Sequence, residues 1–237
     1  TYRAMEWSGD AVMKLSMEER MTLCNMAIEA GGKNGIIEAD EVTIDYVTQR
    51  TDAPYKVYHS DEDAKYFFKR TYNADEMEPI VAKPHSPDNK AKVSECEDVS
   101  LDRAYIGSCT GGKLTDFMAA AKLLKGKKVQ IDTFIVPATR EVEEDLHKEK
   151  IDGESLIDIF KNSGAYLGEP CCAACLGGPK DTFGRAGDNQ VVISTTNRNF
   201  PGRMGSKQSH VYLASPYTAA ASALTGHITN PAEFVYN

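Results

Sequence analysis

The spacing of apolar residues separates a helix-rich first part of the chain from a second part in which strands and helices alternate. Residues 8–50 carry apolar positions at helical intervals, and a capping box at 16–19 predicts the start of a helix. The apolar stripe that this helix should bury consists of Met17, Met21, Cys24 and Ile28. The pair Gly31-Gly32 should end the helix, and further helices are expected over 40–50 and 61–72.

Residues 76–98 differ from the rest of the chain, because prolines flank polar sequence with few large apolar residues. This composition is typical of a linker, so we place a domain boundary near residue 98. Beyond it, the pattern predicts strands over 103–107, 129–136, 191–195 and 211–214, and helices over 114–124, 140–148, 156–163 and 216–224. Such alternation favours an α/β fold with a mostly parallel sheet. The expected domains are therefore 1–98 and 99–237.

Charge and length narrow the class of protein. The 237 residues have a formal net charge of −8 and no basic tract, which argues against a nucleic-acid partner. No apolar run approaches the ~20 residues that a membrane-spanning helix needs, and the first residues lack the apolar core of a signal peptide. We therefore expect a soluble protein of the cytoplasm or, alternatively, the chloroplast stroma. The chain also begins without an initiator Met, which suggests a fragment, a mature form or a processed product.

Six cysteines carry most of the candidate chemistry, at positions 24, 96, 109, 171, 172 and 175. A long acidic chain is unlike the small secreted scaffolds in which disulfides dominate, so we expect a reducing compartment. Cys109 lies between a predicted strand and a predicted helix, where open α/β folds place their sites. Cys172 and Cys175 form a C-x-x-C among small residues. This spacing alone also fits a redox pair, half a zinc site or two core cysteines.

A third segment, residues 195–203, follows a predicted strand and carries Arg198 and Arg203, whose guanidinium groups are suited to bidentate carboxylate binding. Together the three segments resemble the aconitase superfamily, and most closely the large subunits of isopropylmalate dehydratases. The motifs that carry the resemblance are Gly107-Ser108-Cys109-Thr110, the C-x-x-C-Leu-Gly at 172–177, and Ser-Thr-Thr-Asn-Arg-Asn-Phe-x-Gly-Arg at 194–203. The resemblance extends from residues 15–31 to residues 215–227 and so covers nearly the whole chain.

The resemblance implies aconitase-like three-layer α/β/α domains and an iron–sulfur enzyme. In that family one cysteine and a C-x-x-C hold a [4Fe–4S] cluster through three irons, and by position these would be Cys109, Cys172 and Cys175. The fourth iron has no cysteine, unlike the irons of an electron-transfer cluster held by four thiolates. It acts as a Lewis acid that makes hydroxide a tolerable leaving group. The remaining cysteines, Cys24, Cys96 and Cys171, would not be ligands.

The resemblance also implies roles for five polar residues. Asn25 and Glu29 match catalytic residues that point at the cluster and its bound hydroxyl, and a spacing of four would place both on one helix face. Asn197 matches a residue that hydrogen-bonds near the cluster. Arg198 and Arg203 match arginines that bind substrate carboxylates. The function so implied is the isomerisation of 2-isopropylmalate to 3-isopropylmalate in leucine biosynthesis, by loss and return of water.

Parts of the family's active site have no counterpart in this sequence. The Asp–His pairs of the family's amino-terminal region are missing, and the catalytic serine belongs to a separate domain, which in isopropylmalate dehydratases is the small subunit. Gly205-Ser206-Lys207 resembles that serine loop only superficially. We therefore expect the chain to hold a cluster and to need the small subunit for a complete site. The alternatives are a homoaconitase or related large subunit and, from other classes, a cluster-free RNA-binding protein or a zinc-stabilised module.

Overall fold

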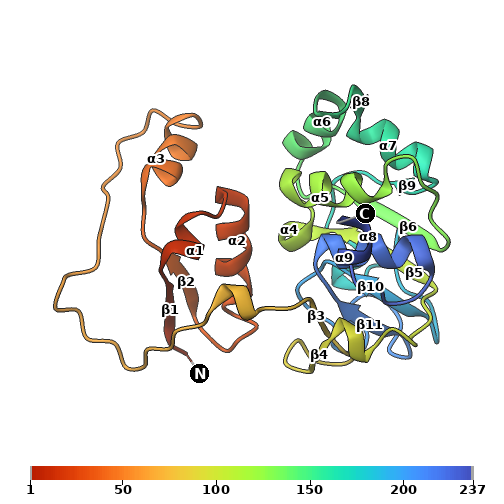
Figure 1. Ribbon diagram of the computed structural model, residues 1–237, viewed down its shortest axis with the longest axis horizontal. Coiled ribbons are helices and arrows are strands. Elements are labelled where there is room, and N and C mark those ends of the chain that lie inside the picture. Colours follow the sequence, from red (N-terminus) through yellow and green to blue (C-terminus); the bar gives the residue numbers. More distant parts are fainter. Residues whose placement is uncertain (1, 236–237) are drawn as a thin grey trace. The chain divides into compact units, whose positions relative to one another are not determined.

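The computed structural model describes residues 2–235 and divides the chain into two compact units, Thr1–Met77 and Glu78–Asn237 (Figure 1). The boundary predicted near residue 98 lies inside the second unit. The reason is that part of the expected linker pairs with a sheet, as strands β3 (Ile80–Ala82) and β4 (Lys90–Lys92). The prolines of this segment lie outside the two short strands, where they interrupt no ladder hydrogen bond.

The first unit combines one parallel strand pair with short helices. Its elements are β1 (Ala4–Trp7), α1 (Asp10–Met13), α2 (Met17–Met26), β2 (Asn34–Ile37), α3 (Glu41–Thr48) and the 3-10 helix η1 (Ala74–Glu76). Residues 8–50 are thus less helical than predicted, because β2 separates the two longer helices. The helix predicted over 61–72 is wrong, since the backbone of these residues forms neither helix nor strand.

Helix α2 begins as predicted but buries a different side chain. The Ser16 hydroxyl accepts a hydrogen bond from the Glu19 N–H at 3.3 Å, and the Glu19 carboxylate accepts one from the Ser16 N–H at 2.8 Å, which confirms the capping box. The buried apolar stripe is wrong, because Ile28 is 51% exposed and the methionines are half-buried. The buried residue of α2 is Arg20.

Arg20 connects α2 to the start of α3. Its guanidinium donates two hydrogen bonds to the Asp40 carboxylate, at 2.6 and 2.9 Å, and two more to the Met13 and Leu15 carbonyls. Asp40 also caps α3 by accepting a hydrogen bond from the Thr43 N–H at 3.2 Å. A buried charge with this many partners is tolerated. The guanidinium of Arg20 in turn lowers the pKa of the Asp40 carboxyl to about 2.

The second unit is built on a seven-stranded sheet with strand order β4-β3-β11-β10-β5-β6-β9. The five strands from β11 to β9 run parallel, while β3 and β4 are antiparallel. These strands are β5 (Arg103–Gly107), β6 (Asp132–Val136), β9 (Tyr166–Leu167), β10 (Val191–Ser194) and β11 (His210–Leu213). A separate antiparallel pair comprises β7 (Lys150–Ile151) and β8 (Glu154–Ser155). All four predicted strands are present, which confirms the mostly parallel α/β fold.

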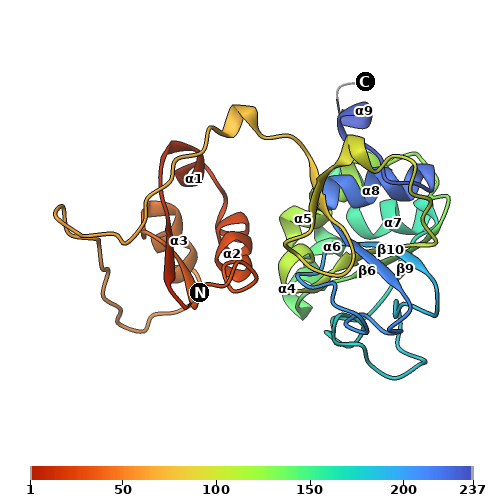
Figure 2. The same cartoon turned by 90° about the horizontal axis from the view of Figure 1, so that it is seen from below.

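Helices cover one face of this sheet (Figures 1 and 2). They are α5 (Leu114–Leu124), α6 (Arg140–Lys148), α7 (Leu156–Ser163) and α8 (Pro216–Thr225), all four predicted within one residue. The short helical segments are η2 (Val93–Glu95), α4 (Ser108–Gly111), η3 (Ala174–Leu176) and α9 (Ala232–Val235). Because side chains alternate along a strand, Ala104 and Ile106 join the core under the helices, whereas Tyr105 joins a second core with Ala174 and Met204. Among residues 2–235, no helix is long and apolar enough to cross a membrane.

Candidate functional site

The first candidate thiol, Cys109, is presented by a tight turn at the end of the central strand β5. The strand ends at Gly107, and a Cβ there would lie 2.6 Å from the Val136 carbonyl oxygen of the neighbouring strand. Ser108 follows with a φ of +76°, in the left-handed region that non-glycine residues seldom occupy. Ser108 and Thr110 are buried, whereas Cys109 is exposed. The turn therefore presents one thiol at the carboxyl edge of the sheet.

The hydroxyl of Thr195, which follows β10, lies against the backbone of this turn. Its Oγ1 is 2.9 Å from the Gly107 nitrogen and 3.0 Å from each of the Gly107 and Gly111 carbonyl oxygens. A Cβ on Gly111 would lie 2.3 Å from the Cβ of Thr195, so this contact requires glycine. Because β5 and β10 are adjacent and parallel, the first and third sequence motifs meet here.

Lys113 holds the same turn from its other end. Its Nζ is buried and donates hydrogen bonds to the Thr110 carbonyl oxygen and to the Asp116 carboxylate, the latter at 2.7 Å. The Asp116 carboxylate also accepts a hydrogen bond from the Lys113 N–H at 3.0 Å, at the start of α5. None of the sequence motifs marked Lys113 as a site residue. The only available signal was its position three residues before an Asp at a predicted helix start.

The C-x-x-C segment forms a second tight turn. The Leu176 N–H donates to the Cys172 carbonyl oxygen at 3.0 Å, so the chain makes one helical turn in which Cys172 is exposed and Cys175 is 5% exposed. Gly177 then adopts a φ of +69°. A Cβ at Gly177 would lie 2.6 Å from the Gly202 carbonyl oxygen. The absence of a side chain thus lets this turn pack directly on the loop that carries the arginines.

The pKa of the Cys175 thiol is affected by Arg203 and by the other two candidate thiols. Burial raises the pKa of the Cys175 thiol, and the positive charge and hydrogen bond of Arg203 oppose that rise. Negative charge on Cys109 and on Cys172 raises the same pKa further. Within residues 2–235, the buried Nε of Arg203 and the buried hydroxyl of Tyr105 have no hydrogen-bond partner. Both atoms are enclosed by the protein, so a ligand could reach them only if the surrounding side chains moved.

Asn199 anchors the arginine loop to the sheet. Its Nδ2 lies 2.9 Å from the Lys83 carbonyl oxygen, 3.0 Å from that of Val211 and 3.3 Å from that of Ala82. Asn199 is 1% exposed, so these bonds join the loop to β3 and β11 away from solvent. Asn197 and Arg198 precede it in the same loop and are half-buried.

Asn25 and Glu29 belong to the first unit, apart in sequence from the cysteine and arginine loops. Asn25 lies in the last turn of α2, which ends at Met26. Glu29 follows in an irregular turn and donates its N–H to the Met26 carbonyl oxygen at 3.1 Å. The single helix that was expected to carry both residues is therefore not observed, because α2 ends before Glu29.

The other cysteines have ordinary environments. None of the six cysteines, all of which the structure describes, forms a disulfide. Cys96 lies in the core under the helices, Cys171 packs against the second core, and Cys24 is half-buried in α2. The hydroxyl of Ser206 is part of a turn, where it accepts a hydrogen bond from the Gln208 N–H at 3.1 Å.

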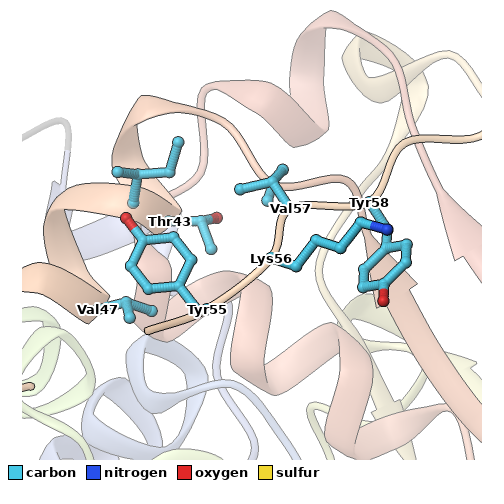
Figure 3. A pocket seen from close by; sticks show the side chains of 8 residues that line it. Thr43, Val47, Tyr55, Lys56, Val57 and Tyr58 are labelled. Atoms are coloured by element: carbon cyan, nitrogen blue, oxygen red, sulfur yellow. The ribbon is translucent and has the colours of Figure 1, made fainter. Parts of the chain in front are cut away.

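A small pocket of about 240 Å³ lies in the first unit and contains none of the predicted site residues. Its lining consists of Ala39, Thr43, Ile44, Val47 and residues 55–58. Figure 3 shows the Tyr55 ring beside Thr43 and Val47 of α3. The Nζ of Lys56 lies 4.8 Å from the centre of the Tyr58 ring. The pocket is thus the space beneath the segment that crosses α3.

The described part of the chain contains no preformed site for a single metal ion. Within residues 2–235, no three His, Cys, Asp or Glu side chains converge closely enough to hold one ion. This holds for the thiols of Cys109, Cys172 and Cys175, although the charges of Cys109 and Cys172 raise the pKa of the Cys175 thiol. A closed, four-ligand zinc site therefore has no support among these residues.

Comparison with known proteins assigns the family. A model of the aconitase family (aconitate hydratase) matches residues 1–226. The chain is 54% identical to the chloroplastic 3-isopropylmalate dehydratase large subunit of Arabidopsis thaliana, with 99% of this chain and 47% of the relative aligned. It is 49% identical to the 3-isopropylmalate dehydratase large subunit of Heliobacterium modesticaldum, over 98% of this chain and 54% of the relative. The chain thus spans about half the length of these relatives, and it belongs to the aconitase family.

Proposed function

We propose that Cys109, Cys172 and Cys175 hold a [4Fe–4S] cluster, and that the chain is the cluster-bearing part of a 3-isopropylmalate dehydratase large subunit. The observation that supports the proposal most directly is the packing of both cysteine turns on the arginine loop. The Gly107 N–H next to the Cys109 turn donates to Thr195 at 2.9 Å, and a Cβ at Gly177 after the C-x-x-C would lie 2.6 Å from the Gly202 carbonyl oxygen. The names of the similar proteins support the reaction. That reaction is the conversion of 2-isopropylmalate to 3-isopropylmalate by dehydration and rehydration.

The residues of the site fit such a group. Thiolates are the usual ligands of iron–sulfur clusters, and three of them on different irons lie further apart than the ligands of a single ion. The lack of a single-ion site among the described residues is compatible with this. The Arg203 side chain hydrogen-bonds to Cys175, which opposes the rise in the pKa of that thiol, and Gly177 removes a side chain from the turn. Hydrogen bonds near cluster sulfurs are a common way to tune such centres.

The chain's own residues have separate tasks in the proposed reaction. When bound, the cluster supplies a Lewis-acidic iron for the leaving hydroxyl. Arg198 and Arg203 bind and orient the substrate carboxylates, with Asn197 hydrogen-bonding beside them. The arginines also stabilise the negative charge that grows on a carboxylate when the proton next to it is removed. We further assign Asn25 and Glu29 as catalytic residues.

A second polypeptide is part of the proposal. The name "large subunit" given to the relatives implies a small subunit in those proteins. We propose that a small subunit binds this chain, supplies the serine base and contacts the variable side group of the substrate. The proposed compartment is the cytoplasm or, in line with the name of the Arabidopsis relative, the chloroplast stroma.

Iron content of cysteine variants tests the ligand assignment. Cys109→Ser, Cys172→Ser and Cys175→Ser should each lose the bound iron of the anaerobically reconstituted chain, together with its absorbance near ~400 nm, an order-of-magnitude expectation for thiolate-ligated clusters. Cys24→Ser, Cys96→Ser and Cys171→Ser are matched controls and should retain the iron. Full iron in Cys172→Ser protein would contradict the assignment.

A reconstitution experiment tests the need for a partner. The reconstituted chain alone should not dehydrate 2-isopropylmalate, because no serine base has been identified in it. Turnover on the order of 1 s⁻¹ or faster, which is ordinary for an enzyme, would show that the base lies within these 237 residues. Activity that appears only with a small subunit, and that fails with malates carrying other 2-substituents, would support both the partner and the substrate.

A further inference from the structure

We propose that Thr195 is a positioning residue, whose buried hydroxyl fixes the turn that carries Cys109. This inference rests on the proposed function, because the turn has to hold its thiol in register with those of Cys172 and Cys175. Nothing in the motif itself assigns a task to this threonine, which precedes Thr196 and the polar residues of the arginine loop.

The contacts of Thr195 are specific to the turn. Its Oγ1 accepts a hydrogen bond from the Gly107 N–H at 2.9 Å and lies 3.0 Å from both the Gly107 and the Gly111 carbonyl oxygens. These two glycines flank Cys109 on either side. The side chain is 3% exposed, so water does not replace a lost bond easily. The Thr195 hydroxyl therefore contacts the backbone at both ends of the turn, at Gly107 and at Gly111.

The turn needs these contacts because its own backbone conformation is unfavourable. Ser108 has a φ of +76°, and a non-glycine residue in this region persists only where its surroundings enforce it. One of the contacts that enforce this conformation is the close packing of Gly111 on Thr195. A Cβ built on Gly111 would lie only 2.3 Å from the Cβ of Thr195. Since Cys109 directly follows Ser108, a turn that relaxes would displace the thiol.

The neighbouring threonine provides a matched control. Thr196 is also 3% exposed, but its hydroxyl lies 3.0 Å from the Ser194 hydroxyl and 3.4 Å from the Met204 sulfur. It therefore faces the second core rather than the Cys109 turn. Replacing either threonine with valine removes one buried hydroxyl at nearly constant volume. Only the replacement at 195 should affect Cys109.

The experiment uses the full chain with Thr195→Val, Thr195→Ser and Thr196→Val. In the apo protein, amide exchange of Gly107 should be about tenfold faster in Thr195→Val, as expected when a buried N–H loses its acceptor. After anaerobic reconstitution, the same variant should release iron to a chelator about tenfold faster. Thr195→Ser retains the hydroxyl and should stay within about twofold of the unchanged protein in both measurements, as should Thr196→Val.

The outcomes separate this inference from the proposed function. If the unchanged chain binds no iron, the proposed function fails, and exchange at Gly107 alone decides whether Thr195 fixes the turn. Unchanged exchange in Thr195→Val, or faster exchange with unchanged iron release from a chain that does bind iron, would overturn the inference. Equal effects of Thr195→Val and Thr196→Val would show general destabilisation and would also overturn it. If Thr195→Val does not fold, Thr195→Ala takes its place.

Discussion

Asp40→Asn should destabilise the first unit by about 2 kcal/mol at pH 7. The Asp40 carboxylate receives two hydrogen bonds from the buried guanidinium of Arg20, and its pKa is about 2 rather than the ordinary 3.8. This difference in pKa corresponds to ~2.4 kcal/mol in the free energy of unfolding. Because the Asp40 side chain is 27% exposed, solvent screens the pair, and we expect slightly less than that value.

The assay is urea unfolding followed by tryptophan fluorescence. The chain has one tryptophan, Trp7, and it lies in β1, so its emission reports on the first unit alone. The pKa of the Asp40 carboxyl is lower in the folded than in the unfolded chain. Its contribution to stability is therefore complete well above pH 3.8, begins to fall near pH 5 and is largely lost once the pH has fallen through about 2. The difference between the two proteins should thus close between about pH 5 and pH 2.

Asp45→Asn is the control, since it makes the same charge change at an exposed position of the same helix. It should change the free energy of unfolding by less than about 0.5 kcal/mol. A pH-independent difference for Asp40→Asn would refute the reasoning, because it would show that the ionised pair is not the cause. Equal effects of the two variants would refute it as well.

Three further predictions concern the second unit. Gly111→Ala should lower the midpoint of thermal unfolding by several degrees, because the new Cβ would lie 2.3 Å from the Cβ of Thr195. Gly187→Ala is the control and should leave the midpoint unchanged, because its new Cβ would meet only a glutamine side chain. Asn199→Ala should cost about 2 kcal/mol in urea unfolding followed by circular dichroism, because three buried carbonyls share its amide. In the complete proposed enzyme, Arg203→Lys should lower kcat/KM at least about tenfold with the iron retained, because an ammonium cannot bind a carboxylate bidentately. Unchanged kinetics would place Arg203 outside the site.

The sequence predicted the elements whose apolar side chains find a core within the same unit. The helix over 114–124 has the predicted bounds because its apolar residues, among them Phe117 and Leu124, pack beneath it on the sheet. Residues 61–72 have their aromatic side chains among many more charged ones than that helix has, and Phe67 is 78% and Phe68 is 70% exposed. A short helix without a buried face is only marginally stable, so pattern alone misleads there.

The part of the site that lies in contiguous sequence motifs was predictable. Cys109 and the C-x-x-C could be identified as candidate ligands from the sequence, and the structure packs both of their turns against the arginine loop, at Thr195 and at Gly202. The contacts that fix the Cys109 turn in place were not predictable from the sequence. The bond from Gly107 to Thr195 spans 88 positions and depends on β5 lying beside β10, a strand order that periodicity does not encode.

The close packing of Gly177 on Gly202 has a consequence for protein engineering. Because a single methyl group at Gly177 would lie 2.6 Å from the Gly202 carbonyl oxygen, the backbones of the two loops determine each other's path. A chimera that takes residues 172–177 from one relative and residues 195–203 from another would join two surfaces that were never fitted together. Grafts between family members should therefore transfer both loops as one cassette, and directed evolution of either loop should yield compensating changes in the other.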